Sequence, residues 1–500
     1  MRVPGGGLFR RLLPGGSLAD RTIKSGIWVT ISNITDRGLQ LLLLVILARL
    51  LAPADFGLMG IALLTATALR RLSNLGLNQA LIYQKGDDVD HYLNTAWSME
   101  VARGLLLAAV TFAIAPLVAD LFHEPRALPV LQMVAISPLL TGIRNPGVIY
   151  FQKNLEFHKQ LVYQLSGSFT NFIVAVTIAV IYGSVWALVL GYVLADAARL
   201  VVSYLAHEFR PGLSFDLSAA RELFTYGKWV TGGGIVTFLY SQGDDAVVGW
   251  LLNATSLGFY QVAYQFAMAP ATEIAAVISS VAFPSYSKLQ DDVPALREAF
   301  FQTVQVSTAV SFPLAVGIVA VAPTFVVAFL GETWEPTIVP IQLIGVYAFL
   351  ISMTMTFAPV WQARGHPDYG TKVSALRTVF LAIVIIPATL QYGIVGTAAA
   401  VVATYVVPSV PIDIYLLVRT VETTYGRFVR EITYPLVASL LMGGAVWATQ
   451  LLVTVNPLVE FVLLVIVGAG VYGAVVFVLT TRFGWSLGRN IRTIGAVVRG

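Results

Sequence analysis

A segment of 32 residues occurs twice in this chain without a gap, first at 26–57 and again at 227–258. Eight positions are identical in this register: Gly26/Gly227, Trp28/Trp229, Val29/Val230, Thr30/Thr231, Ile34/Ile235, Leu50/Leu251, Leu51/Leu252 and Gly57/Gly258. Both copies are long apolar stretches that carry a few charged residues. Two similar halves that each open with such a helix are typical of a membrane transporter whose substrate site lies where the repeats meet. They are not the plan of an enzyme with one asymmetric pocket.

The composition places the chain in a membrane. It is 57% hydrophobic and 12% charged, with a mean hydropathy of +0.77, whereas a soluble domain carries roughly 25% charged residues. The net charge of +4 is dispersed along the chain, so no nucleic-acid partner is expected. The absence of cysteine excludes disulfides and thiolate metal sites. The five histidines have no metal-ligand spacing, so we expect neither a metal nor a cofactor.

Apolar windows of about 20 residues, the length that spans a bilayer, predict an all-α integral membrane protein with about fourteen transmembrane helices. The predicted spans are 25–50, 57–82, 92–120, 128–150, 161–182, 185–206, 226–252, 257–283, 300–330, 336–362, 371–391, 393–418, 432–453 and 458–480. The first twelve form two pseudo-repeated six-helix lobes, and the last two stand outside the repeat.

The distribution of basic residues predicts that both termini are cytoplasmic. In that orientation 25 of the 31 Lys and Arg residues face the cytoplasm, Arg144 and Arg377 among them, and only Arg49 and Arg126 fall at the outer face. The predicted domains are a cytoplasmic lead-in at 1–24, an N-lobe at 25–207, a linker at 208–225, a C-lobe at 226–419, two helices within 432–480 and a tail at 481–500. Arg10-Arg11 also fits a twin-arginine signal, but the apolar run that follows is too long for one.

Several charged residues lie inside the predicted spans. An ionisable residue at mid-bilayer costs about 2.5–3.5 kcal/mol on insertion scales, and such residues usually face an interior cavity. The first two predicted spans carry three arginines, Arg37, Arg70 and Arg71, but one central carboxylate, Asp36. In the third span, Arg103 follows Glu100 by one helical turn. Because a guanidinium group is suited to phosphate, a cationic cavity predicts an anionic substrate. The predicted substrate-binding residues are Arg37, Arg70, Arg71 and Arg103. The alternative is a structural ion pair between Asp36 and Arg70 or Arg71.

The second half carries acidic residues instead. Arg70 and Arg71 correspond to Ala271 and Thr272 in the repeat register, while carboxylates appear in the seventh and eighth predicted helices. We predict that these charged groups serve gating between the lobes, cation or proton coupling, or hydrogen bonding to sugar hydroxyls. The predicted gating residues are Asp36, Asp244, Asp245 and Glu273. For Asp245, simple solvation near the outer surface is the alternative.

Five stretches of the sequence resemble a known family. They are ARLLAPADFG at 48–57, SNLGLNQA at 73–80, GDD at 243–245, LGFY at 257–260 and FPSYSKL at 283–289. They are similar to the polysaccharide-transporter family, which includes Wzx-type oligosaccharide flippases and belongs to the multidrug/oligosaccharidyl-lipid/polysaccharide exporter superfamily. The resemblance implies a MATE-like two-lobe fold with a central cavity that moves lipid-linked saccharides between leaflets.

The combined reading is a flippase and not an enzyme. It is expected to carry a polyprenyl- or dolichyl-phosphate-linked oligosaccharide across the cell membrane, from the cytoplasmic to the outer leaflet, by alternating access, for cell-surface polysaccharide or glycoprotein synthesis. Its expected partners are the lipid-linked oligosaccharide, membrane lipids and polysaccharide assembly enzymes, and its expected state is a monomer. A MATE-like drug or cation antiporter is the alternative, and it would require an acidic first lobe. A membrane glycan polymerase or glycosyltransferase would require a large outer loop with paired carboxylates.

Overall fold

The computed structural model describes residues 18–74, 90–214, 216, 238–453, 455–483 and 485, and all regular structure within these residues is helical. The all-α fold class is therefore confirmed. The chain divides into two compact units, Met1–Gly258 and Phe259–Gly500. The boundary between the units falls inside a helix, whereas the lobes predicted from sequence were separated by a linker at 208–225.

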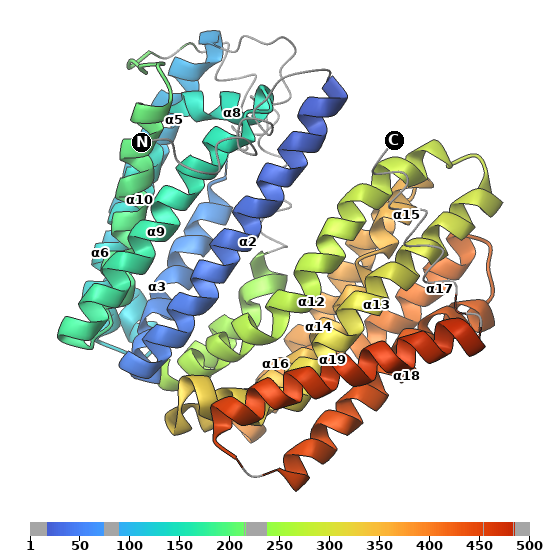
Figure 1. Cartoon of the computed structure of the whole chain (residues 1–500). Coiled ribbons are helices and arrows are strands. Elements are labelled where there is room, and N and C mark those ends of the chain that lie inside the picture. Colours follow the sequence, from blue (N-terminus) through green and yellow to red (C-terminus); the bar gives the residue numbers. More distant parts are fainter. Residues whose placement is uncertain are drawn as a thin grey trace, which may run out of the picture. The chain divides into compact units, whose positions relative to one another are not determined.

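In the first unit, long helices alternate with short ones. They are α2 (Leu18–Leu50), α3 (Pro53–Leu72), α5 (Asp90–Leu121), α6 (Ala127–Val134), α7 (Ile136–Gly142), the 3₁₀ helix η1 (Pro146–Val148), α8 (Ile149–Lys153), α9 (Phe157–Tyr182), α10 (Trp186–Ala206), a helix over 238–251 and the start of α12 (Ala254–Lys288). Helix α9 packs lengthwise against α10 and also against α2 (Figure 1).

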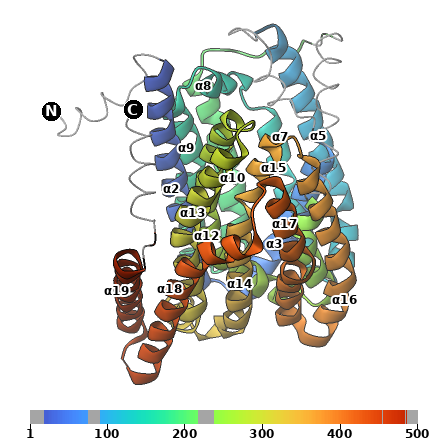
Figure 2. The ribbon, with the colours of Figure 1, turned by 90° about the vertical axis from the view of Figure 1, so that its right-hand side faces the viewer.

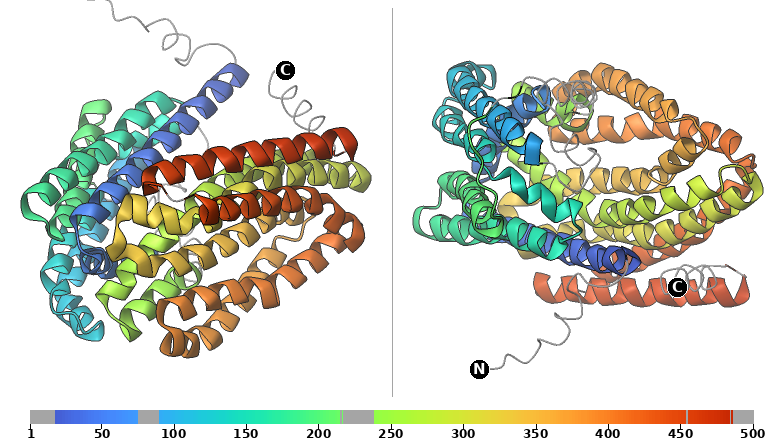
Figure 3. Two further views of the ribbon diagram at one scale, coloured as in Figure 1. Left: turned by 60° about the horizontal axis from the view of Figure 1, so that its bottom comes forward. Right: turned by 90° about the horizontal axis from the view of Figure 1, so that it is seen from above.

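The second unit contains the rest of α12 and is built around one long helix, α13. Its further elements are α13 (Val293–Phe325), the π-helix η2 (Val326–Leu330), the 3₁₀ helix η3 (Glu332–Thr337), α14 (Ile338–Thr354), α15 (Phe357–Ala363), α16 (Asp368–Thr404), the π-helix η4 (Tyr405–Ser409), α17 (Val410–Thr420), α18 (Tyr425–Leu452) and α19 (Pro457–Arg482). Helix α13 packs against both α14 and α18. Helix α19 lies beside α18 (Figure 2) and at the rim of this unit (Figure 3).

The span predicted at 128–150 is not one straight helix. It breaks into α6 and α7, and a bend of 70° separates 127–142 from 146–153. Asn145 is extended, with φ −64° and ψ 117°, and its side chain accepts a hydrogen bond from the Gly147 backbone N–H. A residue before proline is disfavoured in helical conformation, and Pro146 begins a new helix at the position where its missing N–H costs nothing. The sequence Asn145-Pro146 therefore causes the bend.

The predicted division between 371–391 and 393–418 coincides with a break inside α16. Gly393 has φ 58° and ψ −141°, so two helical segments meet there. At 1.5 Å per residue, one unbroken helix of this length would extend roughly 55 Å, well beyond a hydrocarbon core of about 30 Å. By length and composition, the described residues contain nine helices that can cross a membrane, or ten if the bent pair is one span. The count of fourteen stays a prediction.

The ends of the two repeat copies contact each other within the first unit. A Cβ atom on Gly57 would lie 1.7 Å from the Ala254 backbone oxygen, and one on Gly258 would lie 2.0 Å from the Pro53 oxygen. Gly57 corresponds to Gly258 in the repeat, and Pro53 to Ala254, so each copy makes the same contact with the other. Such a self-complementary arrangement is the mark of a two-fold relation. Small residues allow membrane helices to approach at this distance.

Candidate functional site

Asp36 and Arg37 lie near the middle of α2, where they form a polar cluster with α9. One Asp36 carboxylate oxygen accepts a hydrogen bond from the Ser168 hydroxyl, and the other accepts one from the Gln40 amide at 2.8 Å. Arg37 donates to the Gln40 side-chain oxygen at 3.2 Å, so Gln40 bridges the two charged groups. Within the described residues Asp36 has no ion pair with Arg70 or Arg71. The alternative reading, an ion pair that would join the first two helices, therefore has no counterpart in this part of the chain.

Arg70 and Arg71 were predicted at the centre of a helix over 57–82, and this prediction is wrong. Helix α3 ends at Leu72, which places both arginines in its last turn. The Ser73 hydroxyl bonds to the Leu69 backbone oxygen at 2.8 Å, and serine and asparagine side chains compete with helical backbone bonds in this way. Basic residues are favoured at a helix C-terminus by the helix dipole. Arg70 donates a hydrogen bond to the Tyr192 hydroxyl on α10, whereas Arg71 is exposed.

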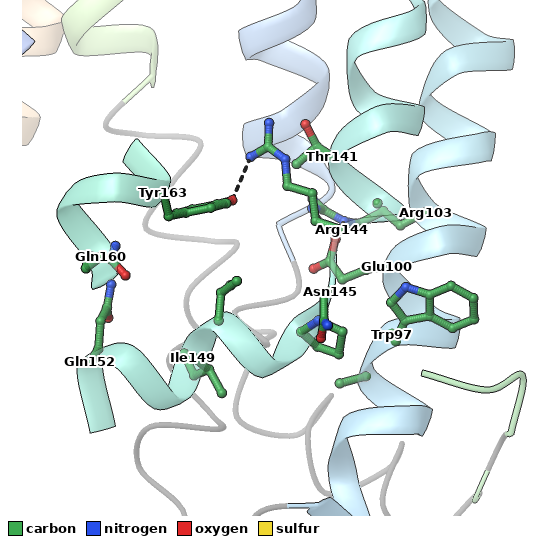
Figure 4. A pocket seen from close by; sticks show the side chains of 14 residues that line it. Trp97, Glu100, Arg103, Thr141, Arg144, Asn145, Ile149, Gln152, Gln160 and Tyr163 are labelled. Atoms are coloured by element: carbon green, nitrogen blue, oxygen red, sulfur yellow. Dashed lines mark hydrogen bonds and ion pairs between the residues drawn. The ribbon is translucent and has the colours of Figure 1, made fainter. Parts of the chain in front are cut away.

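Arg103 lies on α5 and, as their spacing of one helical turn allows, forms an ion pair with Glu100, at 2.6 Å. Both residues line a cavity of about 290 Å³ that is bounded by α5, α7, η1, α8 and α9. Trp97, Glu100 and Arg103 come from α5, and Gln160 and Tyr163 of α9 lie on the opposite side (Figure 4). Of the four predicted substrate-binding arginines, Arg103 is the one that lines this cavity.

The predicted gating residues of the second half are only partly described. Asp244 and Asp245 lie on the helix over 238–251, and Asp244 is 4% exposed. Glu273 lies on α12, but its side chain is outside the described part of the chain. Residues 227–235, which carry the first identities of the second repeat copy, are also outside it.

Sequence reasoning missed a buried charge cluster on α10. Asp196 is 5% exposed and lies at the middle of that helix. Its carboxylate accepts hydrogen bonds from Arg144 at 2.6 Å and Arg199 at 3.3 Å, and also from the Ser137 hydroxyl. The Arg199 guanidinium packs over Gly167 of α9, where a Cβ would lie 2.3 Å from Nε. Arg144 also lines the cavity and donates to Tyr163 at 3.3 Å.

The second unit contains a similar cluster that was also missed. Asp413 is 1% exposed and pairs with Arg377 at 2.5 Å. Arg377 also donates to the hydroxyls of Ser409 at 2.7 Å and Tyr405 at 2.9 Å, and its guanidinium lies 4.2 Å from the Tyr405 ring centroid. A buried charge is tolerated when it is paired and hydrogen-bonded. This cluster joins α16, η4 and α17.

A signal for both clusters was present in the sequence. Asp196 and Asp413 are carboxylates within apolar spans, which is the criterion that singled out Asp36. Arg144 and Arg377 were instead assigned to the cytoplasmic side as part of the positive-inside distribution. An arginine near a helix end can either help to orient the protein in the membrane or form a buried ion pair. Which of the two roles it has depends on the helix that packs against it.

The apolar helices of the described residues define a multi-pass membrane protein. A solved structure of the lipid II flippase MurJ, in an inward closed conformation, matches with a TM-score of 0.75 and 16% identity over 91% of this chain and 99% of that one. An inward-facing MATE family transporter matches with a TM-score of 0.62 and 14% identity over 78% of this chain and 96% of that one. These similarities confirm the MATE-like fold.

Sequence comparisons then identify the family. Residues 46–339 match the model of the "Polysaccharide biosynthesis protein" family, and the chain belongs to that family. The lipopolysaccharide biosynthesis protein WzxC of Escherichia coli K12 is 25% identical over 85% of this chain and 86% of its own length. The teichuronic acid biosynthesis protein TuaB of Bacillus subtilis is 22% identical over 85% of this chain and 88% of its own length. The family predicted from the short stretches is thereby confirmed.

Proposed function

We propose that this protein is a flippase that moves a polyprenyl- or dolichyl-phosphate-linked oligosaccharide from the cytoplasmic to the outer leaflet by alternating access. The observation that carries the proposal is the set of guanidinium groups on the membrane helices of the first unit. Arg37, Arg70 and Arg71 have no carboxylate within ion-pair distance among the described residues. Unpaired arginines in an apolar environment favour an anionic ligand. Both chain termini are cytoplasmic in this proposal.

The proposal gives different roles to the charged side chains. Arg37, Arg70, Arg71 and Arg103 bind the phosphate of the carrier lipid, and Asp36, Asp244, Asp245 and Glu273 serve gating or ion coupling. Asp36 supports the gating role because the hydrogen bond that it accepts from Ser168 joins α2 to α9. A cation antiporter would instead bind its substrate through carboxylates. The two functions are therefore distinguished by whether transport requires the arginines or the carboxylates.

The test is the double variant Arg70→Ala/Arg71→Ala. We expect transport to fall more than tenfold while expression and membrane insertion stay normal, because the variant removes two cations that no described carboxylate needs. Lysine at both positions should rescue only part of the activity, since it lacks the planar donor fork. Transport is measured by complementation of polysaccharide export in a host that lacks its own flippase.

Two controls sharpen this test. Tyr192→Phe removes the hydrogen bond partner of Arg70 but keeps both charges, and it should retain most of the activity. Arg126→Ala removes an exposed arginine from the same unit and should have no effect. Full transport by the double alanine variant would refute the assignment of phosphate binding to these arginines.

We also propose that the two C-terminal helices shelter the lipid tail of the substrate. A cavity of about 440 Å³ lies among α13, α14 and α18. Its polar amides are occupied, because Gln342 donates to the Val319 oxygen at 3.3 Å and Gln450 donates to the Ala320 oxygen at 3.0 Å. The lining that remains is mostly aliphatic, with Trp447 at its edge. Deleting α18 and α19 should therefore impair transport of long-chain carriers more than insertion of the other helices.

A point variant tests the same idea without removing a helix. Gly444 lines the cavity, and a Cβ there meets nothing within 4 Å, so Gly444→Leu should fill the space without disturbing α18. We expect transport of a long-chain carrier to fall severalfold, while a short-chain analogue is little affected. Gly470→Leu on α19 is the matched control, because Gly470 is also uncrowded but does not line the cavity. Equal transport of both carriers by Gly444→Leu would contradict the proposal.

A further inference from the structure

We propose that the cavity bounded by α5, α7, η1, α8 and α9 binds an anionic sugar unit, such as a sugar phosphate or a uronate, with Arg144 as its principal cation. This inference rests on the proposed flippase function and assigns part of its substrate to a place. The site is separate from the arginines at 37, 70 and 71, none of which lines the cavity.

The charges around this cavity do not balance. Three guanidinium groups, those of Arg103, Arg144 and Arg199, meet two carboxylates, those of Glu100 and Asp196. Asp196 is shared by Arg144 and Arg199, so it cannot neutralise both. Among the described residues of this cluster, one positive charge remains uncompensated. An uncompensated charge with little exposure favours binding of an anion.

Arg144 is the group best placed to use that charge. It lines the cavity, and its side chain is 18% exposed. Arginine has five N–H donors, and Arg144 uses one nitrogen toward Asp196 and another toward Tyr163. Its Nε is buried and has no hydrogen bond to the described part of the chain. The ion pair with Asp196 fixes the guanidinium while donors remain for a ligand. Figure 4 shows the hydrogen bond of the guanidinium to Tyr163.

The remaining lining suits a sugar ring better than a bare phosphate. The side-chain amides of Gln152 and Gln160 line the cavity, and they have no hydrogen bond within the described residues. Each amide can both donate to and accept from a hydroxyl. Trp97 uses its indole N–H toward the Ile143 oxygen at 3.2 Å, which leaves its ring as an apolar surface.

The size of the cavity limits what can enter. Its volume of about 290 Å³ is near the lower end of the roughly 300–1,000 Å³ that small-molecule pockets occupy. A single charged sugar unit fits this range. A complete oligosaccharide or a polyprenyl tail does not, so the site would hold one residue of the glycan while the rest lies elsewhere.

The experiment is isothermal titration calorimetry of the purified full-length protein with glucose 1-phosphate, inorganic phosphate and glucose. We expect glucose 1-phosphate to bind best, and Arg144→Gln to weaken its binding at least tenfold. Arg126→Gln is the control, because it removes an exposed arginine of the same unit that lies outside both the cavity and this charge cluster. Its affinity should stay within about twofold of the natural protein. The single variant could fail to fold because it leaves the buried Asp196 without Arg144. The double variant Arg144→Gln/Asp196→Asn removes both charges of this pair, and it should lose affinity in the same way.

Three results would overturn the proposal. They are unchanged affinity in both Arg144 variants, an equal loss in Arg126→Gln, and equal affinity for inorganic phosphate and glucose 1-phosphate. Binding is measured without transport, so the two proposals fail separately. If the natural protein binds glucose 1-phosphate but moves no lipid-linked oligosaccharide, the site stands and the flippase function falls.

Discussion

Replacing Gly57 or Gly258 by leucine should abolish transport and strongly reduce the yield of folded protein. A Cβ on either glycine would lie within 2.0 Å of a backbone oxygen on the other repeat copy. Backbone atoms cannot rotate away as a side chain can, so the starts of α3 and α12 would have to separate. Overpacking inside a protein typically costs about 1–3 kcal/mol, and a backbone collision lies at or above the upper end of that range.

The control for this prediction is Gly38→Leu on α2. A Cβ at Gly38 meets nothing within 4 Å, and leucine has the higher helix propensity, so this variant should fold and transport normally. Yield and monodispersity are measured by size-exclusion chromatography, and transport by complementation. Because the contact is symmetric in the repeat register, the Gly57 and Gly258 variants should be equally impaired. Normal folding and transport in either one would show that the close approach is not required.

Breaking the buried ion pair of the second unit should cost about 3–5 kcal/mol of stability. Arg377→Leu leaves the Asp413 carboxylate buried with only the Ser409 hydroxyl as a described partner, at 2.7 Å. It also removes the contacts of the guanidinium with Tyr405. We expect a clear fall in the apparent Tm of the purified protein. The double variant Arg377→Leu/Asp413→Leu should recover much of the loss, because no uncompensated charge remains inside.

The same helix offers a matched control. Lys372 and Asp368 form an ion pair at the start of α16, but their side chains are 72% and 48% exposed. Lys372→Leu should leave the Tm almost unchanged, because solvent already screens both charges. A similar loss of Tm in Lys372→Leu and Arg377→Leu would mean that burial does not determine the strength of the Arg377 interaction.

Features that depend on nearby residues could be predicted from the sequence. The apolar composition placed the chain in a membrane and made it helical, because a backbone in lipid must satisfy its hydrogen bonds within each segment. The pair of Glu100 and Arg103 followed from their spacing of one helical turn. The division of α16 at Gly393 followed from the length that a bilayer allows. The repeat indicated that Gly57 and Gly258 are equivalent.

The partners of the buried charges were decided by the tertiary structure alone. An ion pair of Asp36 with Arg70 or Arg71 was the alternative to a cavity role, but Asp36 contacts Ser168. Arg144 and Arg377 were assigned to the cytoplasmic side but pair with Asp196 and Asp413. A helix in a soluble protein shows its buried face through an apolar stripe. A helix in lipid can be apolar on every side, so its sequence does not reveal which face turns toward a neighbour. That rotation, set by packing against helices far along the chain, decides which carboxylate meets which guanidinium.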